Sequence, residues 1–448
     1  MDTSVCSALA SMRLDDPALA EAASQAWEYL DGTDEAERVT QWRVQSFCWY
    51  MLPRDRFVAS PAQVAAALAD LLARVGLSRY ADIARSETTG EILAAAESGD
   101  RWPALAERAM TASGILPPDT SMISWAYYSG PAESVAYVAV ADALELAVQV
   151  GEYTPGRSGW RGRRAEITDR VLVAEHAQIG GVVPYDQIVR ERIEAWTDVP
   201  GSPLRTRLLG PVGRQLAEPV PVPEPATVER LLGRVTGLLA IIGTGVPLTQ
   251  AGYLRPDVVA RCVDELALDA MGDSRREGDQ PTLLLLRETV QRLGLIRRRS
   301  GRLVLSAAGR AALHDVARLW SEVAARLVPE PGVRGSGQTQ ASVAVWDLVL
   351  AGLVAAPSAD RGETIEHCRV VLDESGWRLA GGGPIDLMTT ADLYYEVYRA
   401  ISSLGLLRPW SSDRPPGVDE PVPGAADLIR AALRHRLLHS RTLVRVPR

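Results

Sequence analysis

The residue run with the clearest chemical character in this chain is "GLIRRRSGRLVLSAAGRAALHD", residues 294–315. Three consecutive arginines lead into Ser300 and Gly301, and a short apolar segment follows. An arginine guanidinium presents a planar fork of donors that matches phosphate oxygens and guanine edges, so the run has the chemistry of a nucleic-acid contact. The same pattern also fits a solvated hairpin whose arginines pair with acids of this chain or of a partner.

The spacing of these arginines indicates which of them can act together. The Ser-Gly pair between two short apolar runs predicts a β-hairpin over about 295–305. Successive side chains of a strand point to opposite faces, so Arg297 and Arg299 share one face and Arg298 takes the other. We therefore predict a phosphate-contacting face made of Arg297, Arg299 and Arg302.

The segment before the hairpin, residues 281–294, predicts a helix. Its apolar residues recur at helical spacing and form one face, made of Leu283, Leu286, Val290 and Leu293. The opposite side is polar, and we expect it to be exposed and to face a nucleic-acid groove: Arg287, Glu288, Gln291 and Arg292. The candidate nucleic-acid-binding residues are therefore Arg287, Gln291, Arg292, Arg297, Arg299 and Arg302.

Residues with catalytic or metal-binding spacing are not found. All 48 Lys-plus-Arg residues are arginine, which excludes a lysine Schiff base, a P-loop lysine and the strand lysine of protein kinases. The four cysteines form no CxxC pair. His435 and His439 are four apart and could share a helix face with a metal, but a solvated basic helix end explains them more simply. We predict no catalytic, cofactor-binding or metal-binding residues, and an enzyme with a site assembled from distant residues stays a less favoured alternative.

Charge is distributed unevenly along the chain, whose net charge is −8. Residues 1–150 hold 21 acids and 10 arginines, whereas residues 226–330 hold 12 acids and 15 arginines. An acidic segment repels phosphates, and only the segment that contains the hairpin has the sign that attracts them.

The order of elements predicts a mainly α, multi-domain protein. Helices followed by a hairpin and a closing helix is the order of a winged-helix module. The stretch "LAEPVPVPEPAT", residues 216–227, reads as a stiff linker because prolines recur through it. The predicted parts are a helical domain (1–150), a mixed helical segment with the Pro-rich linker (151–225), a winged-helix-like domain (226–330), and a linker with a second, diverged winged-helix-like domain (331–448).

The second winged-helix-like domain is predicted from an internal repeat. "YYEVYRAISSLGLLRPW" matches "LRETVQRLGLIRRR" in spacing, and "SSDRPPGVDEPV", which is acidic and Pro-rich, stands in place of the basic wing. Upstream, "EHCRVVLDESGWRLAGG" predicts a further hairpin that turns at residues 373–376.

Two segments, "VPLTQAGYLRPDVVARCVDEL" and "LRETVQRLGLIRRRSGRLVLSAAGRAAL", carry a resemblance to a known family. They resemble the region that follows the naming domain in uncharacterised bacterial proteins of the plasmid open-reading-frame type. The matching residues are Leu248, Thr249, Gly252, Leu254, Arg255, Leu293, Gly294, Leu295, Arg297, Ser306, Gly309 and Arg310. The strand-rich naming domain itself is not visible in residues 1–225. The resemblance implies a winged-helix-like fold and no known activity.

Two functions fit these patterns. The first is a nucleic-acid-associated protein, such as a regulator, that binds the phosphate backbone of a duplex through its winged-helix-like module. The second is a protein-interaction scaffold whose winged-helix units dock a partner.

The start of the chain has no secretory pattern, and the most apolar runs are interrupted by Arg234 and Asp347, so we expect a cytoplasmic protein without a membrane span.

Overall fold

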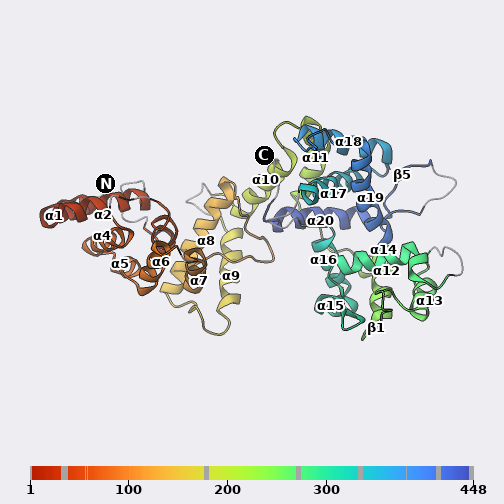
Figure 1. Cartoon of the computed structure of the whole chain (residues 1–448), viewed down its shortest axis with the longest axis horizontal. Helices are drawn as coiled ribbons and strands as arrows, with labels where there is room; N and C mark the ends of the chain where they lie inside the picture. The colour runs from red at the N-terminus through yellow and green to blue at the C-terminus, as the bar shows by residue number, and fades with distance from the viewer. Residues whose placement is uncertain are drawn as a thin grey trace. The chain divides into compact units, whose positions relative to one another are not determined.

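The chain divides into two compact units, which are described separately (Figure 1). A computed structural model describes residues 3–31, 39–55, 57, 59–99, 101–175, 181–268, 274–330, 337–379, 381–409 and 415–442. The first unit comprises Met1–Trp125 and Ser129–Gln187, and the second comprises Ala126–Tyr128 and Ile188–Arg448. The chain is mainly helical, as the sequence predicts, and its few strands are short.

The first unit consists of helices. They are α1 (Thr3–Asp15), α2 (Pro17–Asp31), α3 (Gln41–Ser46) with the π-helical turn η2 (Phe47–Met51), α4 (Pro61–Arg74), α5 (Ser78–Ala84), α6 (Glu87–Glu97), α7 (Trp102–Ser113), α8 (Pro131–Gln149) and α9 (Trp160–Val173). Helix α4 begins as its sequence predicts, because Ser60 and Gln63 form a reciprocal capping box and Pro61 opens the helix. Its apolar face, which includes Val64, Leu68 and Leu72, is fully buried in the core of this unit.

The second unit holds the remaining elements, and α10 (Pro184–Thr197) crosses the boundary between the units. They are α11 (Pro203–Leu216), α12 (Pro225–Ile242), β1 (Val246–Pro247), α13 (Pro256–Glu265), the 3-10 turn η4 (Glu277–Asp279), α14 (Pro281–Arg292), β2 (Ile296–Arg299), β3 (Arg302–Leu305), α15 (Ala307–His314), α16 (Val316–Arg326), α17 (Gly337–Ala355), β4 (Ala359–Asp360), α18 (Arg361–Glu374), α19 (Leu387–Ser403), β5 (Val418–Asp419) and α20 (Ala425–His439).

Strand β3 is the centre of a small antiparallel sheet whose order is β1-β3-β2. Val246 pairs with Leu303, and Ile296 pairs with Leu305. The inward side chains of these pairs are buried together with α12 and α14, so the sheet closes one side of a helical core. The element order α12–β1–α13–α14–β2–β3 places the hairpin directly after α14.

The segment from α17 to α20 shares local features with the segment from α12 to β3. Strand β4 pairs with β5 in antiparallel fashion, as β1 pairs with β3. Both "LGL" segments end a helix in the same way, because Gly294 and Gly405 both have positive φ (70° and 82°). The hydrogen bond from Ser306 N–H to the Leu295 carbonyl corresponds to one from Val422 N–H to the Leu406 carbonyl. These are local similarities between two parts of the second unit, and part of the acidic connection (410–414) lies outside the described residues.

One predicted element is wrong. The sequence of residues 366–382 predicts a hairpin with a turn at 373–376, but helix α18 runs through Glu374. Ile365, Cys368 and Leu372 follow helical spacing and are buried together, so a common buried face outweighs the strand preference of the two adjacent valines.

The Pro-rich stretch after α11 lies inside the second unit. Apolar residues before it, such as Leu209 and Val212, belong to the same buried core as Val228 and Leu232 after it.

Among the described residues, no helix combines the length and apolar character that crossing a membrane needs.

Candidate nucleic-acid interface

The arginine-rich hairpin forms where the sequence predicts it. Ser300 and Gly301 both adopt left-handed backbone (φ 48° and 70°), which is the geometry of a two-residue hairpin turn. Strands β2 and β3 pair from Ile296 with Leu305 to Arg299 with Arg302. At the base of the hairpin Gly309 lies so close to the Leu295 carbonyl that a Cβ would overlap it, so only glycine fits there.

The register places three of the candidate arginines on one face. Arg299 pairs directly with Arg302, and Arg297 pairs with Val304 two residues away, so their side chains lie opposite the buried face of Leu303 and Leu305. Arg297, Arg299 and Arg302 are all exposed. No ion pair joins any of the three to another described residue. The positive charges of this face are therefore exposed to solvent and are not neutralised by an internal ion pair.

The loop before α13 supports the tip of the hairpin. Leu248 N–H donates to the Gly301 carbonyl (2.9 Å), and the Arg302 guanidinium donates to the Gly245 carbonyl. The exposed Arg298 lies against Gly252 on the other face of the hairpin, and the next residue in the chain, Tyr253, is 44% exposed. Arg298 is not among the residues that the sequence predicts for the interface, because strand alternation places it on the other face. Tyr253 is not among them either, because the loop sequence "LTQAGYL" alone gives no sign that it meets the hairpin.

The exposed position expected for Arg287 is wrong. Its side chain is only 2% exposed and its Nε donates to the Glu277 carboxylate, which is fully buried. The second carboxylate oxygen of Glu277 accepts the Leu254 N–H (2.7 Å). Arg287 is buried because it neutralises a carboxylate that holds the loop before α13 in place, and it cannot reach a ligand.

Gln291 and Arg292 lie nearer the surface but are not free either. Gln291 is half-buried, and its amide oxygen is buried without a hydrogen-bond partner among the described residues. Arg292 is exposed, yet its guanidinium donates to the Leu327 carbonyl (3.0 Å). Its Cζ also lies over the ring of Trp346, 5.0 Å from the ring centroid. The structure thus brings Arg297, Arg299 and Arg302 together and leaves Arg287, Gln291 and Arg292 in structural positions.

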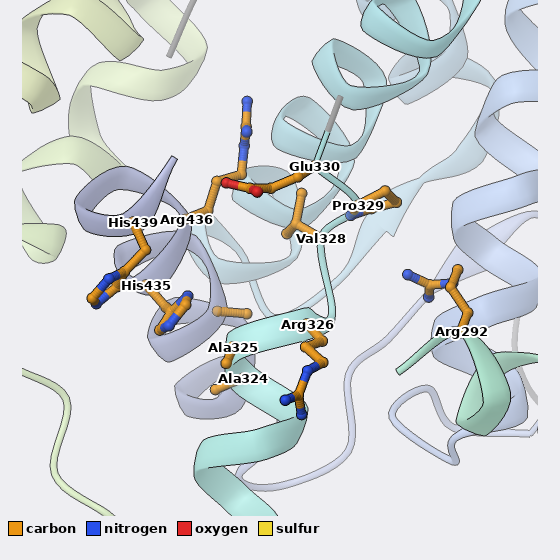
Figure 2. Close-up of a pocket in the computed structure, with 11 residues that line it drawn as sticks. Arg292, Ala324, Ala325, Arg326, Val328, Pro329, Glu330, His435, Arg436 and His439 are labelled. Atoms are coloured by element: carbon orange, nitrogen blue, oxygen red, sulfur yellow. The ribbon is translucent and has the colours of Figure 1, made fainter. Parts of the chain in front are cut away.

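Arg292 also borders a cavity of about 410 Å³ between α16 and α20. Figure 2 shows Arg292 on one side of it and His435 and His439 on the other, so its cationic groups do not converge on one point. The two imidazole rings are stacked, with centroids 4.2 Å apart. Among the described residues no three His, Cys, Asp or Glu side chains are grouped as metal ligands. This cavity is a weaker candidate site than the hairpin.

The stacked pair gives a pH prediction. Burial, then the neighbouring His439 and Arg326, lower the pKa of His435 from 6.5 to about 4. Between these values the unfolded chain binds more protons than the folded one, so stability falls as pH drops from 6.5 towards 4. We expect His435→Gln to lose less stability over this window than the wild type, measured as the melting temperature against pH. Parallel curves for the two proteins would contradict this.

The residues that carry the family resemblance have structural roles in the hairpin region. Thr249 accepts the Tyr253 N–H, Gly252 makes room for Arg298, and the Ser306 hydroxyl caps α15 by accepting the Gly309 N–H (3.0 Å). The chain matches no protein-family model, no curated protein and no solved structure. The resemblance therefore stays a prediction.

Proposed function

We propose that the second unit binds the phosphate backbone of duplex nucleic acid through the hairpin of a winged-helix-like module. In this proposal α12 to β3 form the module, β2 and β3 form its wing, and α17 to β5 form a diverged second copy. The observation that carries the proposal is the exposed face of Arg297, Arg299 and Arg302, which no described carboxylate neutralises.

The chemistry of this face fits a polyanion better than a single small anion. The three guanidinium groups lie on a rigid two-stranded hairpin, so they present fixed, spaced charges rather than a closed pocket. Exposed arginines retain their water and gain mainly by releasing the counterions condensed on a nucleic acid. The docking of an acidic protein partner is the competing function.

The proposal predicts a large loss of affinity when the wing charges are removed. Replacing Arg297, Arg299 and Arg302 together by alanine should weaken duplex binding by on the order of tenfold or more at low salt. The slope of log affinity against log salt should flatten by about one unit for each phosphate that the variant no longer neutralises. Fluorescence anisotropy of a labelled duplex at several salt concentrations measures both effects.

A matched control separates the wing from net charge. Arg261, Arg318 and Arg378 are also exposed arginines of the second unit, but each is in an ion pair with a neighbouring acid. Their triple alanine variant changes net charge equally and should bind much more tightly than the wing variant. Equal weakening in both variants would remove the wing from the interface. If the wild type binds no duplex at low salt, the nucleic-acid function is wrong and the scaffold function takes its place.

A further inference from the structure

The two repeats of the second unit pack against each other through corresponding helices. Helix α14 precedes the hairpin in the first repeat, and α19 has the same place in the second. These two helices lie in contact, and the buried Ser403 of α19 donates to the buried Thr289 of α14 (3.2 Å). One flank of α14 is therefore covered by the chain itself.

The strip of α14 that remains open has little that could recognise a base pair. Its members are the exposed Pro281, Glu288 and Arg292 and the half-buried Thr282, Leu284, Leu285 and Gln291. Side chains that read bases in the major groove donate or accept in pairs, as Arg does with guanine and Gln with adenine. Here the Gln291 oxygen is buried, Arg292 is held by the Leu327 carbonyl, and Glu288 repels the backbone.

Arg287, which the sequence places on the polar side of α14, is also unavailable for a base contact. Arg287 is tied to Glu277 inside the protein, and only 2% and 0% of the two side-chain surfaces are exposed. Releasing it would leave the Glu277 carboxylate buried without a counter-charge, which is strongly unfavourable. Base contacts from this helix are thus opposed by the fold, whereas phosphate contacts from the hairpin are not.

We infer that the wing binds duplexes of any sequence, because the second repeat covers one flank of α14, Arg287 and the Gln291 amide oxygen are buried, and Arg292 is held by the Leu327 carbonyl. This inference rests on the proposed function and specifies its ligand: a double-stranded backbone recognised by charge and shape alone. Contacts to phosphate position a protein on a duplex but carry no sequence information directly.

Selection from a random duplex library tests this inference with the full-length protein. After repeated rounds of binding and recovery at low salt, the bound pool should show no enriched motif. Anisotropy with unrelated duplexes of equal length should give dissociation constants within about threefold of each other, since one mismatched base pair in a specific site would weaken binding by about fivefold or more. An enriched motif that binds tenfold or more tightly than random duplexes would overturn the inference while leaving the proposed function standing.

Variants of α14 provide an independent measurement. Glu288→Ala and Gln291→Ala should each bind within about twofold of the wild type, whereas the triple wing variant binds much more weakly. A loss in either α14 variant that differs between duplex sequences would show that the helix reads bases and would overturn the inference. Failure of the wild type to bind any duplex would instead refute the proposed function, and this inference with it.

Discussion

Arg287→Ala is expected to destabilise the second unit by about 3–5 kcal/mol, because it leaves the Glu277 carboxylate buried without its counter-charge. Arg287 and Glu277 are 2% and 0% exposed, and the remaining partner of that carboxylate is the Leu254 N–H. The loss should appear as a lower midpoint of denaturant unfolding in the full chain. Arg297→Ala, which removes the same charge from the exposed hairpin, should change the midpoint little.

A double replacement distinguishes the effect of an unpaired charge from the effect of poorer packing. Arg287→Met with Glu277→Leu removes both buried charges and keeps apolar volume, so it should recover most of the stability that Arg287→Ala loses. If the double variant is as unstable as Arg287→Ala, the charge of Glu277 is not the cause of the loss. If Arg287→Ala unfolds at the wild-type midpoint, the pair is not structurally important.

The arginines of this chain show why its candidate site could be predicted only in part. The hairpin was predictable because Ser300-Gly301 is a local turn signal and alternation assigns the faces of Arg297 and Arg299. Whether an arginine is exposed depends on partners outside its own helix or strand. Arg287 meets Glu277 across a turn, and no helical period shows that such a carboxylate is buried.

The same distinction between nearby and distant residues applies to the prediction of the fold. Helix starts such as Ser60 and Ser306 were predictable, because a cap depends on residues three positions apart. The sequence predicts a hairpin where α18 forms, and this is wrong because the burial that selects a helix there comes from α17 and α19, which contact it. The contact between α14 and α19 had no local signal at all, although the repeated "LGL" pattern did indicate two related segments.

Several buried arginines of the second unit join elements that are distant in sequence. Arg192 donates to the carbonyls of Leu437 and Leu438 (2.9 and 2.7 Å), and Arg434 donates to the Ala217 carbonyl (2.9 Å). Such contacts tie α10 and the end of α11 to α20. In a chain without lysine, arginine therefore supplies much of the internal polar framework, and a high arginine count is by itself no sign of nucleic-acid binding.

The centre of this framework is Asp347 on α17, which is 1% exposed. It accepts two hydrogen bonds from Arg436 of α20 (2.7 and 3.0 Å), and Arg205 of α11 lies 3.9 Å from its carboxylate. Burial and the neighbouring Arg436 lower the pKa of Arg205, and Asp347 opposes this shift. One carboxylate thus compensates two buried cations from helices on either side of the Pro-rich stretch.

Asp347→Ala should therefore destabilise the second unit by about 3–5 kcal/mol, since it leaves Arg205 and Arg436 buried together without the carboxylate that they share. Asp347→Asn keeps the shape of the side chain and can still accept hydrogen bonds, but it carries no charge. If charge is the main cause of the loss, the denaturant midpoint of Asp347→Asn should lie close to that of Asp347→Ala. An asparagine variant near the wild-type midpoint would show that hydrogen bonding, not charge, holds α11, α17 and α20 together. Asp373→Asn, which alters an exposed ion pair with Arg378, is the matched control and should unfold like the wild type.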